Sequence, residues 1–277
     1  MKIATRESFG LALCELAKTH PEIVVLDADL AAATKTDIFK KAYPERFFDC
    51  GIAEGNMIGV AAGLAACGKV PFAASFAMFA TGRAYEQIRN SVGYPHLNVK
   101  IAGSHAGITV GEDGATHQCC EDLALMRTIP GMVVLNPADH YEMTEAVKAA
   151  LAYNGPVYIR LGRLAIDTFN NPDTYQFELG KGINARLINM HTIKPIDKDI
   201  IIKAAKETGK IITVEEHNII GGLGEAVCAV MSEFCPVPVK RIGVEDTYGH
   251  SGPALGLLAE FGLDAEGLEK RIIEIVK

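Results

Sequence analysis

Features that would place a chain in a membrane or outside the cell are missing from this sequence. The longest apolar run, residues 57–67, is too short and too rich in alanine and glycine to span a bilayer. The first residues also lack the charged, apolar and cleavage regions that make up a secretory signal. We therefore expect a cytoplasmic protein that does not insert into a membrane.

An excess of positive charge and paired cysteines are also missing. The chain has 27 Lys and Arg against 34 Asp and Glu, a net charge of -7. This charge argues against a nucleic-acid or anionic-membrane surface as a main role. None of the seven cysteines forms a C-x-x-C pair, which argues against a structural zinc site. Most of them are expected to be small core residues in a reducing compartment.

Short β-branched or aromatic runs alternate with helical patterns over the first 163 residues. Strands are expected at 23–27, 47–49, 70–74, 99–103, 132–136 and 157–161. Helices are expected at 6–18, 36–42, 54–67, 81–92, 120–127 and 140–153. Continuously apolar strands that alternate with helices predict an α/β fold with a parallel sheet covered on both faces.

A change of pattern after Arg163 suggests a second domain. Residues 168–182 carry Pro, Asn and Gly without a clear period and are interpreted as a linker. Strand and helix patterns then resume at 186–190, 198–207, 210–215, 223–234, 237–242 and 265–276. The predicted organisation is a domain over 1–167, a linker over 168–182 and a smaller α/β domain over 183–277.

One carboxylate, Glu54, stands at the start of a predicted helix that is otherwise small and apolar. It shares a helical face with Ile58, Ala61, Ala62 and Ala65. We expect that face to be buried, and burial favours the protonated form of a carboxyl group. Such a group is typical of a site where a ligand or partner needs it. The plain alternative is a helix-capping acid that interacts with the helix dipole.

A polar, glycine-rich loop, SHAGITVGEDGATHQ at 104–118, directly follows a predicted strand. Functional sites of parallel sheets form at the carboxyl ends of strands, so this loop is a candidate site. Asp29 follows the strand 23–27 in the same way. Taken alone, the run 111–114 is more typical of a surface turn than of a site. His105 and His117 lack the helical spacing of a metal pair, so no metal site is predicted.

The order of these segments resembles the C-terminal half of transketolase, a thiamine-diphosphate enzyme. The segments that carry the resemblance are FFDCGIAEGNM (47–57), ASFAMFATGRAYEQIR (74–89), GITVGEDGATHQ (107–118), NPADHYE (136–142) and INMHTIKPID (188–197). The likeness extends from Ala4 almost to Lys277 and is close to the split transketolases of bacteria and archaea, in which two genes encode the two halves. It implies a pyrimidine-binding domain followed by a smaller transketolase C-terminal domain.

The resemblance implies roles in holding the cofactor. The glutamate that matches Glu54 bonds a ring nitrogen of the aminopyrimidine and so promotes deprotonation of the thiazolium carbon. Phe79 is expected to stack on the pyrimidine with Phe76 beside it, because a flat apolar ring selects a flat ligand. Asp29 and Ile52 are expected at the cofactor crevice.

The resemblance also implies roles toward the substrate, a ketose phosphate that gives a two-carbon ketol unit to an aldose phosphate. His105 and His117 are expected to meet substrate oxygens and assist proton transfer. Asp113 is expected to bond a sugar hydroxyl. Arg6 and Arg163 are expected to face the phosphate, which planar guanidinium groups suit.

Three departures from the family pattern stand out. Ala33 lies where a serine often contacts the phosphate, which puts the strength of that contact in doubt. The second domain lacks the strand and helix that relatives place between GKG and INARLINM, so that Gly182 runs straight into Ile183. No GDG…N motif for Mg²⁺ and diphosphate is found. The resemblance therefore implies an N-terminal partner subunit that carries the Mg²⁺ ligands, assembled with this chain as a dimer of heterodimers.

Two other interpretations stay open at this point. One is the corresponding half of a deoxyxylulose-phosphate synthase or 2-oxo acid dehydrogenase, which pyruvate as donor would reveal. The other is a non-catalytic assembly subunit. The joint presence of Glu54, Phe79, His105 and His117 argues against the second.

Overall fold

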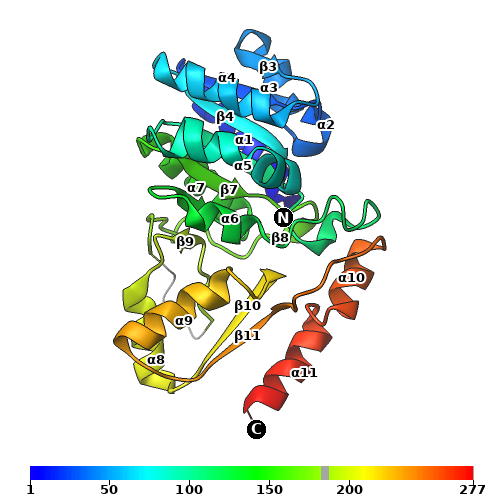
Figure 1. The fold of residues 1–277 in the computed structure, drawn as a ribbon, viewed down its shortest axis with the longest axis vertical. Coiled ribbons are helices and arrows are strands. Elements are labelled where there is room, and N and C mark those ends of the chain that lie inside the picture. Colours follow the sequence, from blue (N-terminus) through cyan, green and yellow to red (C-terminus); the bar gives the residue numbers. More distant parts are fainter. Residues whose placement is uncertain (182–186, 277) are drawn as a thin grey trace.

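A seven-stranded sheet organises the larger part of the computed structural model, which describes residues 1–181 and 187–276. The strand order is β3-β2-β4-β5-β7-β6-β9, and all neighbours are parallel except β6 and β9. Its strands are β2 (Ile23–Asp27), β3 (Phe47–Asp49), β4 (Val70–Phe76), β5 (Lys100–Ser104), β6 (Val133–Leu135), β7 (Val157–Arg160) and β9 (Thr192–Lys194). The predicted α/β class with a mainly parallel sheet is confirmed (Figure 1).

Both faces of this sheet are buried under helices. Within β2, Ile23 and Val25 join one apolar cluster, whereas Val24 and Leu26 join the other. Successive strand residues point to opposite faces, so a strand that is apolar throughout needs cover on both sides. The first cluster includes residues of α1 (Thr5–Leu16) and α7 (His140–Ala152), and the second includes residues of α4 (Glu54–Ala66) and α6 (Asp122–Thr128).

The remaining short elements lie around this sheet. They are β1 (Lys2–Ala4), which pairs with β8 (Ala165–Asp167), α2 (Ala31–Thr34), α3 (Asp37–Ala42), η1 (Pro44–Arg46), η2 (Met78–Arg83), α5 (Tyr85–Gln87), η3 (Ile88–Gly93) and η4 (Ile108–Val110). The sequence predicts one α-helix over 81–92, but η2 and η3 are π-helical, with α5 between them. Single π turns are frequent at functional sites.

The strand predicted at 186–190 is wrong where the structure describes it. Arg186 lies outside the described residues, and residues 187–190 form no strand. The chain instead pairs two residues later, where β9 runs antiparallel to β6. An edge strand exposes unpaired backbone groups, and β9 provides partners for those of β6. Lys194 Nζ fixes this pairing through the carbonyl oxygens of Arg127 and Ile129, at 2.8 and 2.7 Å.

The second α/β unit contains a two-stranded parallel sheet (Figure 1). It consists of α8 (Lys198–Thr208), β10 (Ile211–Asn218), α9 (Leu223–Phe234), β11 (Val239–Val244), α10 (Ala254–Glu260) and α11 (Ala265–Val276). Ile242 and Val244 of β11 pack with Leu257 of α10 and with Ile108 from the first unit. An apolar cluster therefore joins the two units.

The segment before the second unit is irregular yet well held. Residues 168–181 contain no helix or strand. The Asp139 carboxylate accepts hydrogen bonds from the amides of Phe169 and Asn170, at 3.0 and 2.8 Å. Tyr175 donates from its hydroxyl to Glu142 over 2.6 Å. These contacts fasten the segment to α7. The domain boundaries given above stay predictions.

None of the helices that the structure describes combines the length and apolar character needed to cross a membrane.

Candidate active site

Glu54 is the first residue of α4, and its side chain is 1% exposed. Ile58, Ala61 and Ala62 on the same helical face are also buried. The predicted burial of Glu54 is confirmed. Small apolar residues on this helical face let α4 lie close against the sheet. The N-cap residue is Ala53, which provides no side-chain cap, and Glu54 lies in the first turn of α4, where the helix dipole also favours a carboxylate.

The buried carboxylate has a basic partner. Arg83, at the end of η2, donates from Nη1 to Glu54 Oε2 over 3.0 Å. The same guanidinium lies over the ring of Phe79, 4.8 Å from its centre. Arg83 is 55% exposed, so it neutralises Glu54 from the solvent side. Sequence reasoning missed this residue, because nothing in the local pattern links positions 54 and 83.

A stack of aromatic rings lies at the carboxyl ends of β4 and β5. Phe76 is parallel to Phe79 with ring centres 5.8 Å apart, and His105 stacks on Phe76 at 4.0 Å. His117 meets Phe79 edge-on at 5.1 Å. The structure therefore brings four predicted site residues together around one apolar surface. The two distances to Phe79 are those of favourable ring pairs.

His105 is held in an uncommon backbone conformation with φ of 57°. For a residue other than glycine this left-handed conformation costs energy, and such residues cluster at functional sites. Ser104 Oγ lies 2.8 Å from Nδ1, and Arg6 Nη1 lies 3.3 Å from Nε2. Burial, together with the charges of Arg6 and Arg163, lowers the pKa of His105 to about 3. The imidazole is therefore neutral at physiological pH and can exchange hydrogen bonds at both nitrogens.

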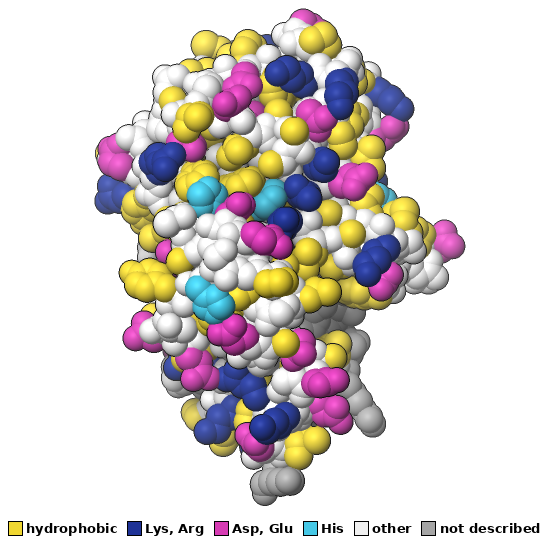
Figure 2. Space-filling model, turned by 90° about the vertical axis from the view of Figure 1, so that its right-hand side faces the viewer, with side chains coloured by type: hydrophobic (Ala, Val, Ile, Leu, Met, Phe, Trp, Pro, Cys, Tyr) yellow, Lys and Arg dark blue, Asp and Glu magenta, His cyan; other side chains and the backbone are white. Residues whose placement is uncertain are grey.

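Two arginines lie beside this histidine. Arg6 donates to the carbonyl oxygen of Ala33 over 2.6 Å, and its buried Nε has no partner among the described residues. Arg163 donates to Val110 O and to Glu112 Oε2, at 2.6 and 3.1 Å. Burial, and the like charge of Arg163, lower the pKa of Arg6. Two guanidinium groups that repel each other here would be stabilised by a bound anion. Figure 2 shows histidine side chains beside basic and hydrophobic ones on one face.

Among the described residues, three predicted site residues do not contact the aromatic stack or the two arginines through hydrogen bonds of their side chains. Asp29, Ile52 and Asp113 are exposed, Ile52 by 76%. No hydrogen bond joins their side chains to the other predicted residues in the part of the chain that is described. Asp29 and Ile52 still follow β2 and β3, so they lie at the same sheet edge as the aromatic stack.

Within residues 1–181 and 187–276, no group of three or more His, Cys, Asp or Glu side chains is arranged to hold a metal ion.

Comparison with known domains accounts for nearly the whole chain. Residues 1–167 match "Transketolase, pyrimidine binding domain", and residues 178–268 match "Transketolase, C-terminal domain". This pair defines a class of α/β protein whose pyrimidine-binding domain implies the use of thiamine diphosphate. The chain belongs to the transketolase family.

Similar proteins include a section and subunits of enzymes of this family. The chain is 47% identical to a putative transketolase C-terminal section of Methanocaldococcus jannaschii, covering 98% of this chain and 96% of the relative. It is 40% identical to a 6-deoxy-6-sulfo-D-fructose transketolase subunit of Clostridium (98% and 94% covered). It is 38% identical to one subunit of the apulose-4-phosphate transketolase of Phocaeicola vulgatus (99% and 98% covered).

The alignment with the first of these relatives spans 306 residues, more than the 277 of this chain. That relative therefore has residues that this chain lacks. The second domain is correspondingly short, with only β10 and β11 in its sheet as far as the described residues show.

Solved structures agree with this assignment. A split-gene transketolase, described as an inactive β4 tetramer, superposes with a TM-score of 0.87 at 47% identity, covering 96% of this chain and 95% of that one. A transketolase from Campylobacter jejuni shares the fold with a TM-score of 0.81 at 24% identity, and the chain covers 47% of its length.

Proposed function

We propose that this chain is the C-terminal subunit of a thiamine-diphosphate-dependent transketolase. The reaction moves a two-carbon ketol unit from a ketose phosphate to an aldose phosphate. One observation carries the proposal. The buried Glu54 carboxylate, the stacked rings of Phe76 and Phe79, and His105 and His117 come together at the carboxyl edge of one parallel sheet.

The described residues fit the pyrimidine half of the cofactor. A buried carboxyl group can share a proton with a ring nitrogen in a strong hydrogen bond, because little water competes with it there. The Phe79 ring lies close to His117 and Arg83 and offers an apolar surface for a flat ring. When bound, thiamine diphosphate supplies the nucleophilic carbon and the electron sink for breaking a carbon–carbon bond. Glu54 and Phe79 orient it, with Asp29 and Ile52 at the rim of the crevice.

The residues beside the ring stack suit a phosphorylated sugar. Arg6 and Arg163 provide guanidinium groups for the phosphate. Arg6 Nε is a buried donor that has no acceptor among the described residues. The neutral His105 and the nearby His117 can take up and return a proton at the sugar oxygens. Asp113, on the exposed loop, can accept a hydrogen bond from a sugar hydroxyl.

We infer that activity requires an N-terminal partner subunit. The chain carries no GDG…N motif for Mg²⁺ and diphosphate, so we expect the partner to supply these ligands. The similar split-gene transketolase described as an inactive β4 tetramer supports this view. The proposed assembly is a dimer of heterodimers, and the proposed location is the cytoplasm.

The test is a mixing experiment. The chain is incubated alone and then with the candidate N-terminal subunit, in the presence of thiamine diphosphate and Mg²⁺. Xylulose 5-phosphate is offered as donor and ribose 5-phosphate as acceptor. Apulose 4-phosphate and 6-deoxy-6-sulfofructose serve as alternative donors, because two similar proteins are named for these ketoses. We expect turnover only in the mixture.

Other outcomes would redirect the proposal. Robust turnover by the isolated chain would contradict the split site. Pyruvate as the preferred donor would favour the deoxyxylulose-phosphate synthase or 2-oxo acid dehydrogenase class. Full activity of the assembled enzyme after Glu54→Ala would favour a non-catalytic assembly subunit.

A further inference from the structure

The loop that carries His105 and His117 is held from the second domain by a carboxylate, and also by the carbonyl oxygen of His250 and the hydroxyl of Ser251. Glu216 on β10 accepts a hydrogen bond at Oε1 from the backbone amide of Thr109, over 2.8 Å. Thr109 is the middle residue of η4, which lies between the two histidines in sequence. A side chain of the second domain therefore contacts the middle of this loop directly.

Gly107 shows how closely Glu216 packs against the loop. A Cβ atom at position 107 would clash with Glu216 Oε1, and φ there is +82°. Gly107 also donates from its amide to the carbonyl oxygen of Cys119 over 2.7 Å, which closes the base of the loop. The Glu216 carboxylate thus lies against the point where the two ends of the loop meet.

The backbone of Glu216 is itself fixed by a buried ion pair. Arg160 donates from Nε to Asp122 Oδ2 over 2.8 Å, and both side chains are almost fully buried. Arg160 Nη2 donates to the carbonyl oxygens of Glu216 and Cys119, at 2.9 and 3.4 Å. One guanidinium therefore joins the strand that carries Glu216 to Cys119, at the end of the loop of His105 and His117 (the histidine loop).

We propose that Glu216 is a positioning residue for the transfer of the ketol unit. Its carboxylate sets the conformation of the loop that presents His105 and His117 to the substrate. The inference rests on the proposed function, because it assigns Glu216 a role through those histidines. It gives the second domain a part in the chemistry beyond assembly. Misplacing a catalytic group by about 1 Å can cost about 100-fold in rate.

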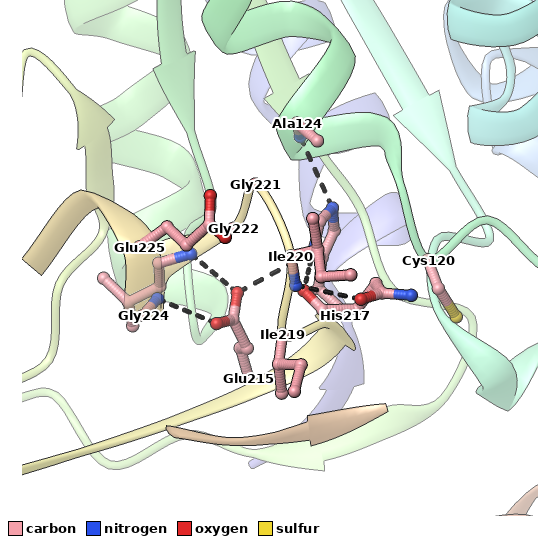
Figure 3. Close-up of polar contacts among 12 residues, drawn as sticks. Cys120, Ala124, Glu215, His217, Ile219, Ile220, Gly221, Gly222, Gly224 and Glu225 are labelled. Atoms are coloured by element: carbon pink, nitrogen blue, oxygen red, sulfur yellow. Dashed lines mark hydrogen bonds and ion pairs between the residues drawn. The ribbon is translucent and has the colours of Figure 1, made fainter. Parts of the chain in front are cut away.

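The neighbouring residue Glu215 provides a matched control. Its carboxylate accepts hydrogen bonds from the amides of Leu223 and Gly224, at 2.6 and 2.8 Å. Figure 3 shows Glu215 directed at Gly224 and the start of α9. Both glutamates lie on β10 and accept from backbone amides, but only Glu216 reaches the histidine loop.

The first arm of the test measures amide hydrogen exchange in the isolated chain. In Glu216→Ala we expect the peptide over 105–118 to exchange about tenfold faster. The hydrogen bond to the Thr109 amide is lost, and a tenfold change corresponds to about 1.4 kcal/mol in the free energy of local opening. In Glu215→Ala the peptide that begins α9 should exchange faster, and 105–118 should stay within about twofold of the original chain. Unchanged exchange of 105–118 in Glu216→Ala would overturn the proposal.

The second arm measures the assembled enzyme. We expect kcat to fall about 10- to 100-fold in Glu216→Ala, with a displaced pH profile and an affinity for thiamine diphosphate within about twofold. Glu216→Gln should recover part of the loss, because its amide oxygen can still accept from Thr109. Glu215→Ala should keep its kcat and pH profile. A loosened loop with unchanged kcat and pH profile would overturn the proposal. An inactive original assembly would overturn the proposed function alone, because the exchange arm needs no turnover.

Discussion

Arg83 Nη1 and Glu54 Oε2 form an ion pair at 3.0 Å that joins the end of η2 to the start of α4. One partner is fully buried and the other is half exposed, so the pair is screened less than a surface pair. In a double-mutant cycle of Glu54→Ala and Arg83→Met, we expect a coupling of about 1 to 2 kcal/mol in the free energy of unfolding.

The exposed pair of Glu15, in the last turn of α1, and Lys18, in the turn that follows, is the control for this cycle, measured by the same urea titrations. Its coupling should be about 0.5 kcal/mol or less. Equal couplings for the two pairs would mean that burial of Glu54 adds nothing to its interaction with Arg83.

Glu54→Gln should lower kcat of the assembled enzyme about 1,000-fold, since a carboxyl group that shares a proton with the cofactor ring promotes the proton transfer that starts the reaction, and an amide cannot transfer that proton. The fold should survive, because Gln has the same shape and can still accept from Arg83. Steady-state kinetics at saturating cofactor and the thermal midpoint of the isolated chain would measure the two effects. Glu15→Gln, far from the site, should match the original enzyme in both.

Arg163→Ala should lower kcat/KM for a phosphorylated acceptor about 10- to 100-fold, because one charged hydrogen bond to the phosphate is lost. For an unphosphorylated aldose the loss should be about threefold or less. Arg89→Ala is the comparison variant, because Arg89 is exposed on η3 and contacts Asn90. A similar loss for both acceptors would argue that Arg163 holds the loop through Glu112 rather than the substrate.

Buried histidines should make the chain sensitive to acid. The pKa of His105 is lowered to about 3 and that of His191 to about 4, in both cases chiefly by burial. Below pH 6.5 these histidines bind protons in the unfolded chain but not in the folded chain. The free energy of unfolding therefore falls as the pH drops toward these pKa values. Each histidine should contribute up to about 1.4 kcal/mol per pH unit in that window.

Urea titrations at pH 7.5 and 5.0 measure this effect. His105→Gln and His191→Gln should each reduce the difference in unfolding free energy between the two pH values. His191 lies outside the candidate site, so a reduction in both variants identifies burial as the cause. An undiminished difference in both would contradict the expected neutral state of these side chains.

The local patterns were enough to predict the sheet and part of the site. Apolar strands such as β2 predicted a sheet buried on both faces, and the small-residue face of α4 predicted a buried position for Glu54. The rule that sites lie at the carboxyl ends of parallel strands predicted the loop of His105 as part of the site, whereas Phe76 and Phe79 were assigned to it only by the family resemblance. The exposure of Ile52 and Asp113 did not follow from any pattern, because it depends on what packs around each loop.

The sequence alone determined the parallel strands of the larger sheet and the buried position of Glu54, and the family resemblance joined the two aromatic rings and the two histidines to that position; β9 and the π-helical turns did not follow from either. Only the tertiary structure decided that Arg83 pairs with Glu54 and that Glu216 holds Thr109. Periodicity reports which face of an element is buried, whereas a contact between positions 29 or 107 residues apart depends on how whole elements pack.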